Sequence, residues 1–450
     1  MGDNFDFSII LRYKKTIGLL NHGMFIECMI NQFEKKIVGR VVEEKSQIID
    51  LVKDFVSLPT ENPPGLNYKE MVKRLERFCN QIGCETEIID VPHSLVKEGA
   101  PDSDGLPRQI LLAYLVKKNS SRGIHFNGHY DVVPASGSWK ISDPYKPIVV
   151  NGEIYGRGTT DMKGPLVSIL IALKVLSENK SKISGNISFS AVPDEEIGGL
   201  TGTGYLLDKK KIRADTCIVA EPSGIGNIWD SHKGQAWFEL IVKGKAAHGA
   251  TPWLGENAFE RASRLAVCLF DKNVNTINKK NTETKIDDSL NIPTTNIGGV
   301  VKGGTKINIV PDFVSFTIDR RILPKEKITT VKNEVKSNIS SCTKKLGIPK
   351  ESLKLNLINY GKAAVVRDPT VTKELSSTVE DIIGYKPTIT LCNGGLDMRY
   401  FEAKGISTVS YGPGNLGAAH MADESVNISD LILGSQTYIL YSYRRLRKSK

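Results

Sequence analysis

Histidine and carboxylate side chains recur along the middle of the chain, each group close behind a short apolar or β-branched run. His129 and Asp131 come first, Asp161 stands in a glycine-rich segment, and Glu195 and Glu196 are adjacent. Imidazole nitrogen and carboxylate oxygen are ligands that Zn²⁺ takes in proteins. One carboxylate can span the roughly 3.5–4 Å between the ions of a two-metal site. The pattern predicts a two-metal hydrolytic site with Asp161 at its centre.

Taken singly, each of these residues also has an ordinary structural explanation. His129 and Asp131 suit a surface loop, Asp161 suits a helix N-cap, and two adjacent glutamates suit a solvated acidic turn. The segment Gly156-x-Gly158 suggests a phosphate loop, but it lacks the third glycine and the Lys-Ser/Thr pair. The joint occurrence of all these residues favours a metal site over coincidence.

Two further ligand candidates follow later in the chain. Glu221 comes after another apolar run, and His420, one of only seven histidines, lies in a glycine-rich loop. The neighbouring carboxylates of Glu195 and Glu196 repel, which raises their pKa values unless a cation lies between them. One of the two can therefore bind metal while the other acts as a general base.

The elements that must position these residues alternate between strands and helices. This alternation predicts an α/β fold with a mostly parallel sheet, in which ligands collect at the carboxyl ends of the strands. Most of the candidate residues fall just after an expected strand. We expect strands over residues 85–91, 109–116, 124–128, 186–192, 216–220, 388–391 and 407–410, and helices over 41–56, 68–82, 165–177, 370–383, 399–403 and 428–444, with a polar loop over 92–107.

A different pattern occupies the middle of the chain and predicts an inserted α+β domain of order β-α-β-β-α-β. Its expected elements are a strand (236–242), a helix (255–270), a surface loop (271–290), two strands (294–301 and 306–318), a helix (325–346) and a strand (353–358). The predicted domains are an extension that we expect to be poorly ordered (1–30), a catalytic metal-binding domain (31–230 with 361–450) and the insertion (231–360).

Composition restricts the class of protein. A chain of 450 residues with 40% hydrophobic and 24% charged residues predicts a globular protein of two domains. The net charge is +10, but the lysines are spread along the chain, so we expect no nucleic-acid partner. Because no run of eighteen uncharged apolar residues occurs, we expect no membrane span. Seven scattered cysteines without a Cys-x-x-Cys pair favour a reducing cytoplasm over a disulfide framework.

As an ordered set, these segments resemble the dinuclear zinc aminohydrolases, a family that includes acetylornithine deacetylase, succinyl-diaminopimelate desuccinylase, aminoacylase and glutamate carboxypeptidase. The resemblance runs from about residue 48 to residue 428. Its motifs are Gly128–Pro134, Gly156–Gly164, Asp194–Glu196, Ala220–Ser223, Lys245–Gly249 and the loop from Ala419 to Glu424.

The resemblance implies a role for each candidate residue of the metal site. His129 and Glu221 would hold one zinc, Glu196 and His420 the other, and Asp161 would bridge them, with a cis peptide to Met162. Asp131 would orient His129. Glu195 would be the general base towards a water that bridges the two ions. Co²⁺ or Mn²⁺ would accept similar ligands.

The resemblance also implies that the inserted domain forms a homodimer and covers the site. His248 would reach the active site of the partner subunit and stabilise the oxyanion. Asn308 and Arg321 would grip the substrate carboxylate, with Arg320 as the adjacent alternative to Arg321.

One further segment, Gly394–Arg399, matches a substrate pocket of the family. Gly395 and Arg399 would bind substrate there. Leu396 departs from the family, which commonly has Thr or Ser at that place, and this departure bears on specificity rather than on hydrolysis.

The expected function is hydrolysis of an amide bond in a small N-acyl amino acid. Segments 59–65 and 221–223 most resemble the deacetylase and desuccinylase branch of the family. A metallo-carboxypeptidase or dipeptidase with the same site is the alternative, because both kinds of enzyme cut an amide next to a carboxylate. A non-catalytic binding protein on this scaffold is a third reading, which the full set of ligands and base disfavours. The acyl group, the amino acid and the native metal are left open.

Overall fold

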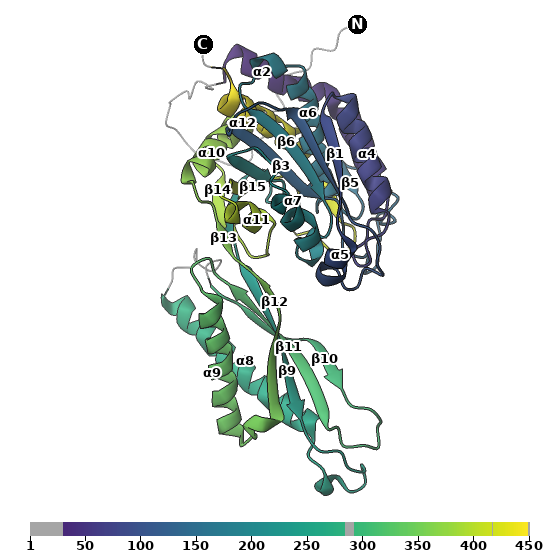
Figure 1. Ribbon diagram of the computed structural model, residues 1–450, viewed down its shortest axis with the longest axis vertical. Coiled ribbons are helices and arrows are strands. Elements are labelled where there is room, and N and C mark those ends of the chain that lie inside the picture. Colours follow the sequence, from purple (N-terminus) through teal and green to yellow (C-terminus); the bar gives the residue numbers. More distant parts are fainter. Residues whose placement is uncertain (1–29, 284–291, 416, 449–450) are drawn as a thin grey trace.

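The structure is a computed structural model that describes residues 30–283, 292–415 and 417–448. It contains two bodies, each with its own sheet and its own apolar core (Figure 1). The larger body holds both ends of the described chain, and the smaller body is built from residues 234–361. The expected N-terminal extension falls, apart from residue 30, outside the described residues.

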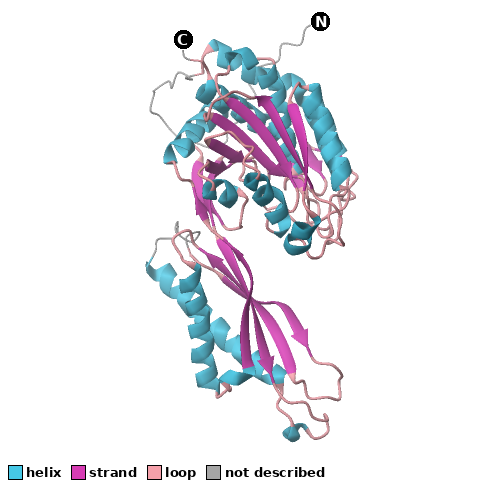
Figure 2. Ribbon diagram, in the orientation of Figure 1, coloured by secondary structure: helices cyan, strands magenta, loops and turns pink. Residues whose placement is uncertain are grey.

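A nine-stranded sheet forms the middle of the larger body (Figure 2). Its order is β1-β2-β6-β3-β7-β15-β8-β13, and β14 pairs with β8. The neighbours β6, β3, β7 and β15 run parallel, whereas antiparallel pairs add β2 and β1 on one side and β8 and β13 on the other. This confirms the expected α/β class. The strands are β1 (Glu85–Asp90), β2 (Gln109–Val116), β3 (Gly123–His129), β6 (Asn186–Val192), β7 (Thr216–Val219), β8 (Asn227–His232), β13 (Ala364–Val365), β14 (Thr388–Cys392) and β15 (Ser407–Ser410).

The sheet has an apolar core on each face, which the side chains of β2 show directly. Leu111 and Ala113 enter the large core, whereas Ile110 and Leu112 enter a smaller one, because successive side chains of a strand point to opposite faces. Helices α3 (Lys45–Val56), α4 (Tyr68–Gln81), α6 (Lys163–Ser177), α10 (Pro369–Ile383) and α12 (Ile428–Leu446) contribute to the large core, and α5 (His93–Gly99) and α7 (Tyr205–Asp208) to the small one.

Local signals explain several helix ends. Asn31 and Glu34 form a capping box at the start of α2 (Gln32–Gly39). Asp368 caps α10, Pro369 occupies its first position, and Gly384 ends it at φ +82°. Helix α6 is apolar on nearly all sides because it packs between the sheet, α3 and α12.

The smaller body has the predicted order β-α-β-β-α-β. Its antiparallel sheet has the order β10-β11-β9-β12, and two helices cover one face of the sheet (Figure 1). The elements are β9 (Gly234–Lys243), α8 (Ala258–Glu283), β10 (Thr295–Gly303), β11 (Phe313–Ile322), α9 (Ile328–Leu346) and β12 (Leu353–Gly361).

A third, small sheet joins two segments that are far apart in sequence. Its order is β16-β5-β4, formed by β4 (Ile148–Val150), β5 (Glu153–Tyr155) and β16 (Ser425–Asn427). It places the chain just before residue 156 beside the chain just after residue 424. This sheet was not predicted from the sequence.

Several expectations were wrong. The expected polar loop over 92–107 contains α5, whose Val96 is buried in the small core. Residues 271–283 continue α8 instead of forming a loop, and the remainder of that expected loop, residues 284–290, lies outside the described residues. The strand expected from residue 306 begins at Phe313, and β8 was not predicted.

The cysteines also differ in part from expectation. Cys268 and Cys342 form a disulfide that joins α8 to α9, with a Cα–Cα distance of 5.9 Å. Four other described cysteines are free and buried: Cys79, Cys84, Cys217 and Cys392. Among the described residues, no helix has the length and apolar character needed to cross a membrane.

Candidate active site

Asp161 lies between two histidines. His129 Nε2 is 3.0 Å from Asp161 Oδ1, and His420 Nε2 is 3.1 Å from Asp161 Oδ2. Two groups of possible metal ligands share this aspartate: one adds His129 and Glu221, and the other adds Glu196 and His420. Within each group the ligand atoms lie within 4.8 Å of one another, so each group can hold one ion and Asp161 can touch both.

The topology of the sheet explains this convergence. His129 ends β3, Glu221 lies just beyond β7, and Glu196 follows β6 in the short helical turn Glu195–Ile197. The strands β6, β3 and β7 are parallel neighbours, so their carboxyl ends meet at one edge. Asp161 and His420 reach this edge from two loops, one before α6 and one before β16.

Asp131 links the first histidine to the glutamate turn. His129 Nδ1 contacts the main-chain oxygen of Asp131 at 2.9 Å and lies 3.5 Å from its Oδ1. The main-chain N–H groups of Glu195 and Glu196 donate to the carboxylate of Asp131, each at 3.3 Å. Asp131 therefore contacts the imidazole of His129 and also holds the turn that carries Glu195.

Asp194 is part of the same network, although no role was predicted for it from the sequence. It is fully buried with φ +63°, and its carboxylate accepts hydrogen bonds from Asn62 (3.0 Å), Tyr68 (3.1 Å) and Arg108 (2.9 Å), as well as from Thr201. Its place directly before Glu195 was the one available signal. Asn62, Tyr68 and Arg108 come from segments far away in the sequence, which alone does not show that they meet Asp194.

Glu195 lies beside both ligand groups but belongs to neither. Burial raises its pKa well above the usual range, and the charges of Glu221 and Asp397 add to this shift.

Charge and hydrogen bonding at the site favour a cation. Burial raises the pKa of Glu221 to about 8, and its Oε1 is buried without a hydrogen-bond partner among the described residues. Hydrogen bonds to Asp161 and Glu196 raise the pKa of His420 to about 11. A bound divalent ion would neutralise these crowded carboxylates, and the mixed N and O donor set suits zinc. The residues present therefore fit the expected ions.

The peptide bond between Asp161 and Met162 is cis, as the resemblance implied. The sulfur of Met162 accepts a hydrogen bond of 3.3 Å from the main-chain N–H of His129.

The structure brings Arg399 close to the site but directs its donors to the main chain. Its Nη1 donates to the oxygen of Leu396 (3.0 Å) and its Nη2 to the oxygen of Gly198 (2.6 Å). A Cβ on Gly395 would lie 2.7 Å from Oε1 of Gln235 in β9, so a larger residue there would require the side chain of Gln235 to move. Leu396 is buried in the large core.

His248 and Asn308 lie together but away from the metal-ligand groups. The N–H of Gly249 donates to the oxygen of Asn308 at 2.8 Å, and both His248 and Asn308 are exposed. His248 follows the end of β9 that points away from the larger body (Figure 1), and its bridge to Ile309 places Asn308 beside it. The ten residues of β9 extend roughly 33 Å, so this chain's His248 is far from its own Asp161.

The two candidate arginines of β11 have different environments. Arg320 is buried and pairs with Glu326 (2.8 Å) and Glu334 (2.9 Å). Arg321 is partly exposed, pairs with Asp319 at 3.1 Å, and lies opposite Gln235, at the end of the sheet nearest the larger body. Of the two, only Arg321 has a side chain that a substrate can approach.

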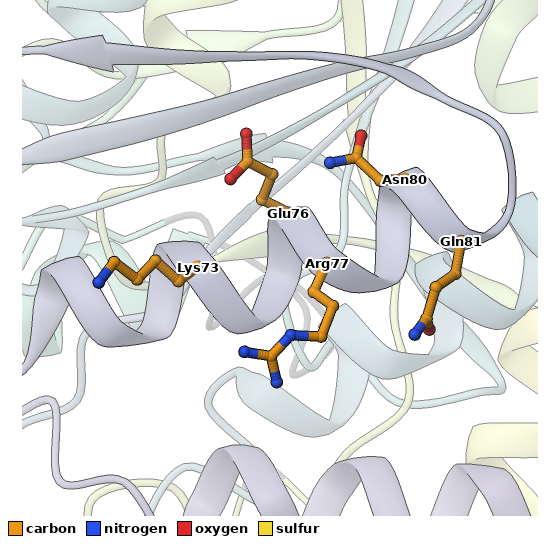
Figure 3. Close-up of a pocket in the computed structure, with 5 residues that line it drawn as sticks. All are labelled: Lys73, Glu76, Arg77, Asn80 and Gln81. Carbon is orange, nitrogen blue, oxygen red and sulfur yellow. The ribbon is translucent and has the colours of Figure 1, made fainter.

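A surface depression of about 570 Å³ lies elsewhere, along α4 (Figure 3). All its lining residues come from one face of this helix, and none is a candidate site residue: Lys73, Glu76, Arg77, Asn80 and Gln81. We interpret it as a solvated helix face.

Comparison with known proteins agrees with this geometry. An uncharacterized metallohydrolase of Methanococcus maripaludis is 28% identical over 421 residues, covering 87% of this chain and 98% of that protein. A succinyl-diaminopimelate desuccinylase of Helicobacter hepaticus is 26% identical over 419 residues, covering 89% and 98%.

Among solved structures, a di-peptidase of Saccharomyces cerevisiae has a similar fold. Its TM-score is 0.73 at 18% identity, over 91% of this chain and 98% of that one. The model of peptidase family M20/M25/M40 matches residues 125–443, which include every candidate ligand. The chain belongs to peptidase family M20/M25/M40.

Proposed function

We propose that this enzyme hydrolyses the amide bond of a small N-acyl amino acid, as a deacetylase or desuccinylase does. The observation that carries the proposal is that Asp161 is shared by two sets of His and carboxylate ligands, with Glu195 beside both. The desuccinylase among the relatives supports the choice of branch.

Two zinc ions per chain are the proposed cofactors. His129, Asp161 and Glu221 would hold one ion, and Asp161, Glu196 and His420 the other. Bound there, the ions would lower the pKa of water and polarise the substrate carbonyl. Co²⁺ and Mn²⁺ suit the same donors.

Glu195 performs the proton transfers in the proposed reaction. Its carboxylate takes a proton from water as the water oxygen bonds to the carbonyl carbon. The same carboxyl group gives this proton to the amide nitrogen as the C–N bond breaks, which releases the amine and the acid. Asp131 keeps His129 and the main chain of Glu195 in place during both transfers.

A second copy of the chain would complete the site. We propose that residues 231–360 form the dimer interface and that His248 of one subunit supports the oxyanion in the other. The distance set by β9 is the reason for this trans role. Exposed apolar side chains offer an interface on α8 (Phe259, Val267, Phe270) and on β10 (Val300, Val301).

Substrate binding is proposed for four residues. Arg321 and Asn308 would grip the carboxylate, with Asn308 coming from the partner because it lies beside His248. Gly395 and Arg399 would shape the substrate pocket, although two donor groups of Arg399 already form hydrogen bonds to main-chain oxygens.

A reducing cytoplasm is the proposed location. Four buried free cysteines support it, and the disulfide between Cys268 and Cys342 is the observation against it. Thiol labelling of the protein in its own cells would test this location. Labelling of Cys268 would mean that Cys268 and Cys342 are reduced there, as a reducing cytoplasm requires.

A metallo-dipeptidase or carboxypeptidase is the second candidate, favoured by the fold of the yeast di-peptidase. A panel of N-acetylornithine, N-succinyl-diaminopimelate, N-acetylmethionine and dipeptides separates the two, assayed before and after chelation. Chelator-sensitive cleavage of an acyl amino acid supports the proposal, and preference for dipeptides supports the second candidate. Metal binding without any cleavage would favour a binding protein.

A further inference from the structure

Glu424 holds the turn that carries Asp161. Its carboxylate is fully buried, and one oxygen, Oε1, accepts main-chain hydrogen bonds from Gly158 (3.0 Å), Thr160 (2.9 Å) and Asp161 (3.0 Å). The main-chain oxygen of Glu424 also accepts from the N–H of Gly156 at 2.9 Å. A single side chain therefore fixes the main chain on the N-terminal side of the shared ligand.

Arg157 connects this carboxylate to the loop of His420. Its Nη1 is 2.6 Å from Oε2 of Glu424, and its Nη1 and Nη2 lie 3.3 Å from the main-chain oxygens of Met421 and His420 respectively. Arg157 is 1% exposed. The guanidinium and the carboxylate thus join two segments that each carry one metal-ligand candidate.

Burial of such a pair demands a compensating arrangement. Removing two charges from water costs several kcal/mol per ion unless good geometry and additional hydrogen bonds satisfy them. Here the carboxylate accepts from four donors and the two Nη groups of the guanidinium contact three oxygens, whereas its Nε is buried without a hydrogen-bond partner among the described residues. Neither Arg157 nor Glu424 belongs to a ligand group, so their contribution to the site is made through position alone.

The two histidines differ in how much they need this support. His129 ends a central strand and is 1% exposed. The side chain of His420 is 49% exposed, and the residue lies in a loop at φ +64°. The loop is anchored to the larger body by Arg157 and by the short strand pair of β16 and β5.

We propose that Arg157 and Glu424 are positioning residues that hold Asp161 and His420 at a fixed separation and thereby set the metal affinity of the Asp161–Glu196–His420 group. This inference rests on the proposed two-metal function. Loss of either residue should lower the metal affinity of the Asp161–Glu196–His420 group more than that of the other group. The other group takes two of its three ligands, His129 and Glu221, from the ends of central strands.

Glu424→Gln tests the inference, since it keeps the shape of the side chain and removes its charge. The zinc-loaded enzyme would be exposed to graded chelator, and the ions that remain per chain would be counted. We expect the ion of the His129–Asp161–Glu221 group to be retained as in the wild type. The ion of the Asp161–Glu196–His420 group should bind about 10–100-fold more weakly. Arg157→Lys keeps the charge but loses the two Nη groups that contact Glu424, Met421 and His420. This variant should weaken binding of the same ion.

Glu334→Gln is the matched control, because it removes a partner of another buried arginine, Arg320, in the smaller body. It should leave both ions as in the wild type. Circular dichroism establishes that each variant is folded, and Arg157→Lys decides the matter if Glu424→Gln does not fold.

The inference would be overturned if the folded variants bound both ions equally more weakly, or bound both as tightly as the wild type does. A wild-type enzyme that holds fewer than two ions would instead overturn the proposed function, and this inference with it.

Discussion

The side-chain amide of Asn62 donates a hydrogen bond of 2.9 Å to Asp131. The same Nδ2 group donates to Asp194 at 3.0 Å, so one amide stands between two fully buried carboxylates. Burial raises the pKa of Asp194, and the charge of Asp131 adds to this shift. Asn62 therefore reduces the repulsion between two carboxylates that both hold the turn of Glu195.

Replacing Asn62 with Ala should lower kcat by about 10–100-fold, the usual effect of removing a hydrogen-bonding partner behind a metal ligand. The control is Asn67→Gly, in the same loop, because the side chain of Asn67 donates to the main-chain oxygen of Pro59, away from both carboxylates, and glycine readily adopts its φ of +57°. Steady-state kinetics on the substrate found by the panel measures the effect. Equal kcat values in the two variants would show that the amide bridge does not support the site.

Glu195→Ala should reduce turnover by about 10²–10⁴-fold, the contribution typical of general acid–base catalysis. The metal content should stay at two ions per chain, since Glu195 belongs to neither ligand group. Elemental analysis beside the kinetic assay gives both values. Loss of an ion from this variant would mean that Glu195 is a ligand instead of the base, and Glu196→Ala, which should lose one ion, provides the comparison.

The sequence predicts those candidate residues that can be recognised from their immediate neighbours in the chain. His129, Glu196 and Glu221 could be predicted because each lies at or just after the end of a strand, and adjacent parallel strands bring such positions together. The order of the inserted elements followed from periodicity in the same way. Asp161 could be singled out because of its glycine-rich surroundings.

The supporting residues could not be predicted, because their roles arise from contacts between distant segments. Arg157 and Glu424 are 267 residues apart, and Asn62 and Asp194 are 132 apart. Each lies in a segment that the resemblance covers, but the sequence alone does not show which residue each one contacts. Arg399 shows the same difficulty: the motif predicts a cation near the pocket, but only the fold shows that its donors point to main-chain oxygens.

The extent of α8 and the presence of α5 were not predicted, for a related reason. Residues 271–283 are rich in Asn, Lys and Thr, and they lack the apolar stripe that signals a helix. They are helical as the continuation of α8. Likewise α5 has a single buried side chain, Val96, too few to produce a periodic pattern.

If His248 acts in trans, subunits with different lesions should complement each other. We expect His248→Ala and Glu195→Ala to be inactive alone, and their mixture to regain up to about a quarter of wild-type activity after subunit exchange, since one site of each mixed dimer is intact. Sedimentation or native mass spectrometry must first show mixed dimers. Verified mixed dimers without recovered activity would exclude the trans role.

The free energy of unfolding should fall in acid because of His125. This residue is fully buried, its ring nitrogens each lie 2.8 Å from a serine hydroxyl, and burial lowers its pKa to about 3. The unfolded chain protonates it near pH 6.5, so below that pH the unfolded state binds the additional proton. Its contribution is fully present above about pH 6.5 and is lost as the pH falls towards about 3, by up to about 5 kcal/mol.

His125→Gln removes this titration and is the direct test. Chemical unfolding of both proteins between pH 7 and pH 4 should show a shallower loss of stability in the variant, because glutamine does not bind a proton in this range. Other titrating groups, including the metal ligands, are common to both proteins and cancel in the difference between them. Parallel pH curves for the two proteins would mean that His125 is already protonated, or never buried as a neutral ring, in the folded enzyme.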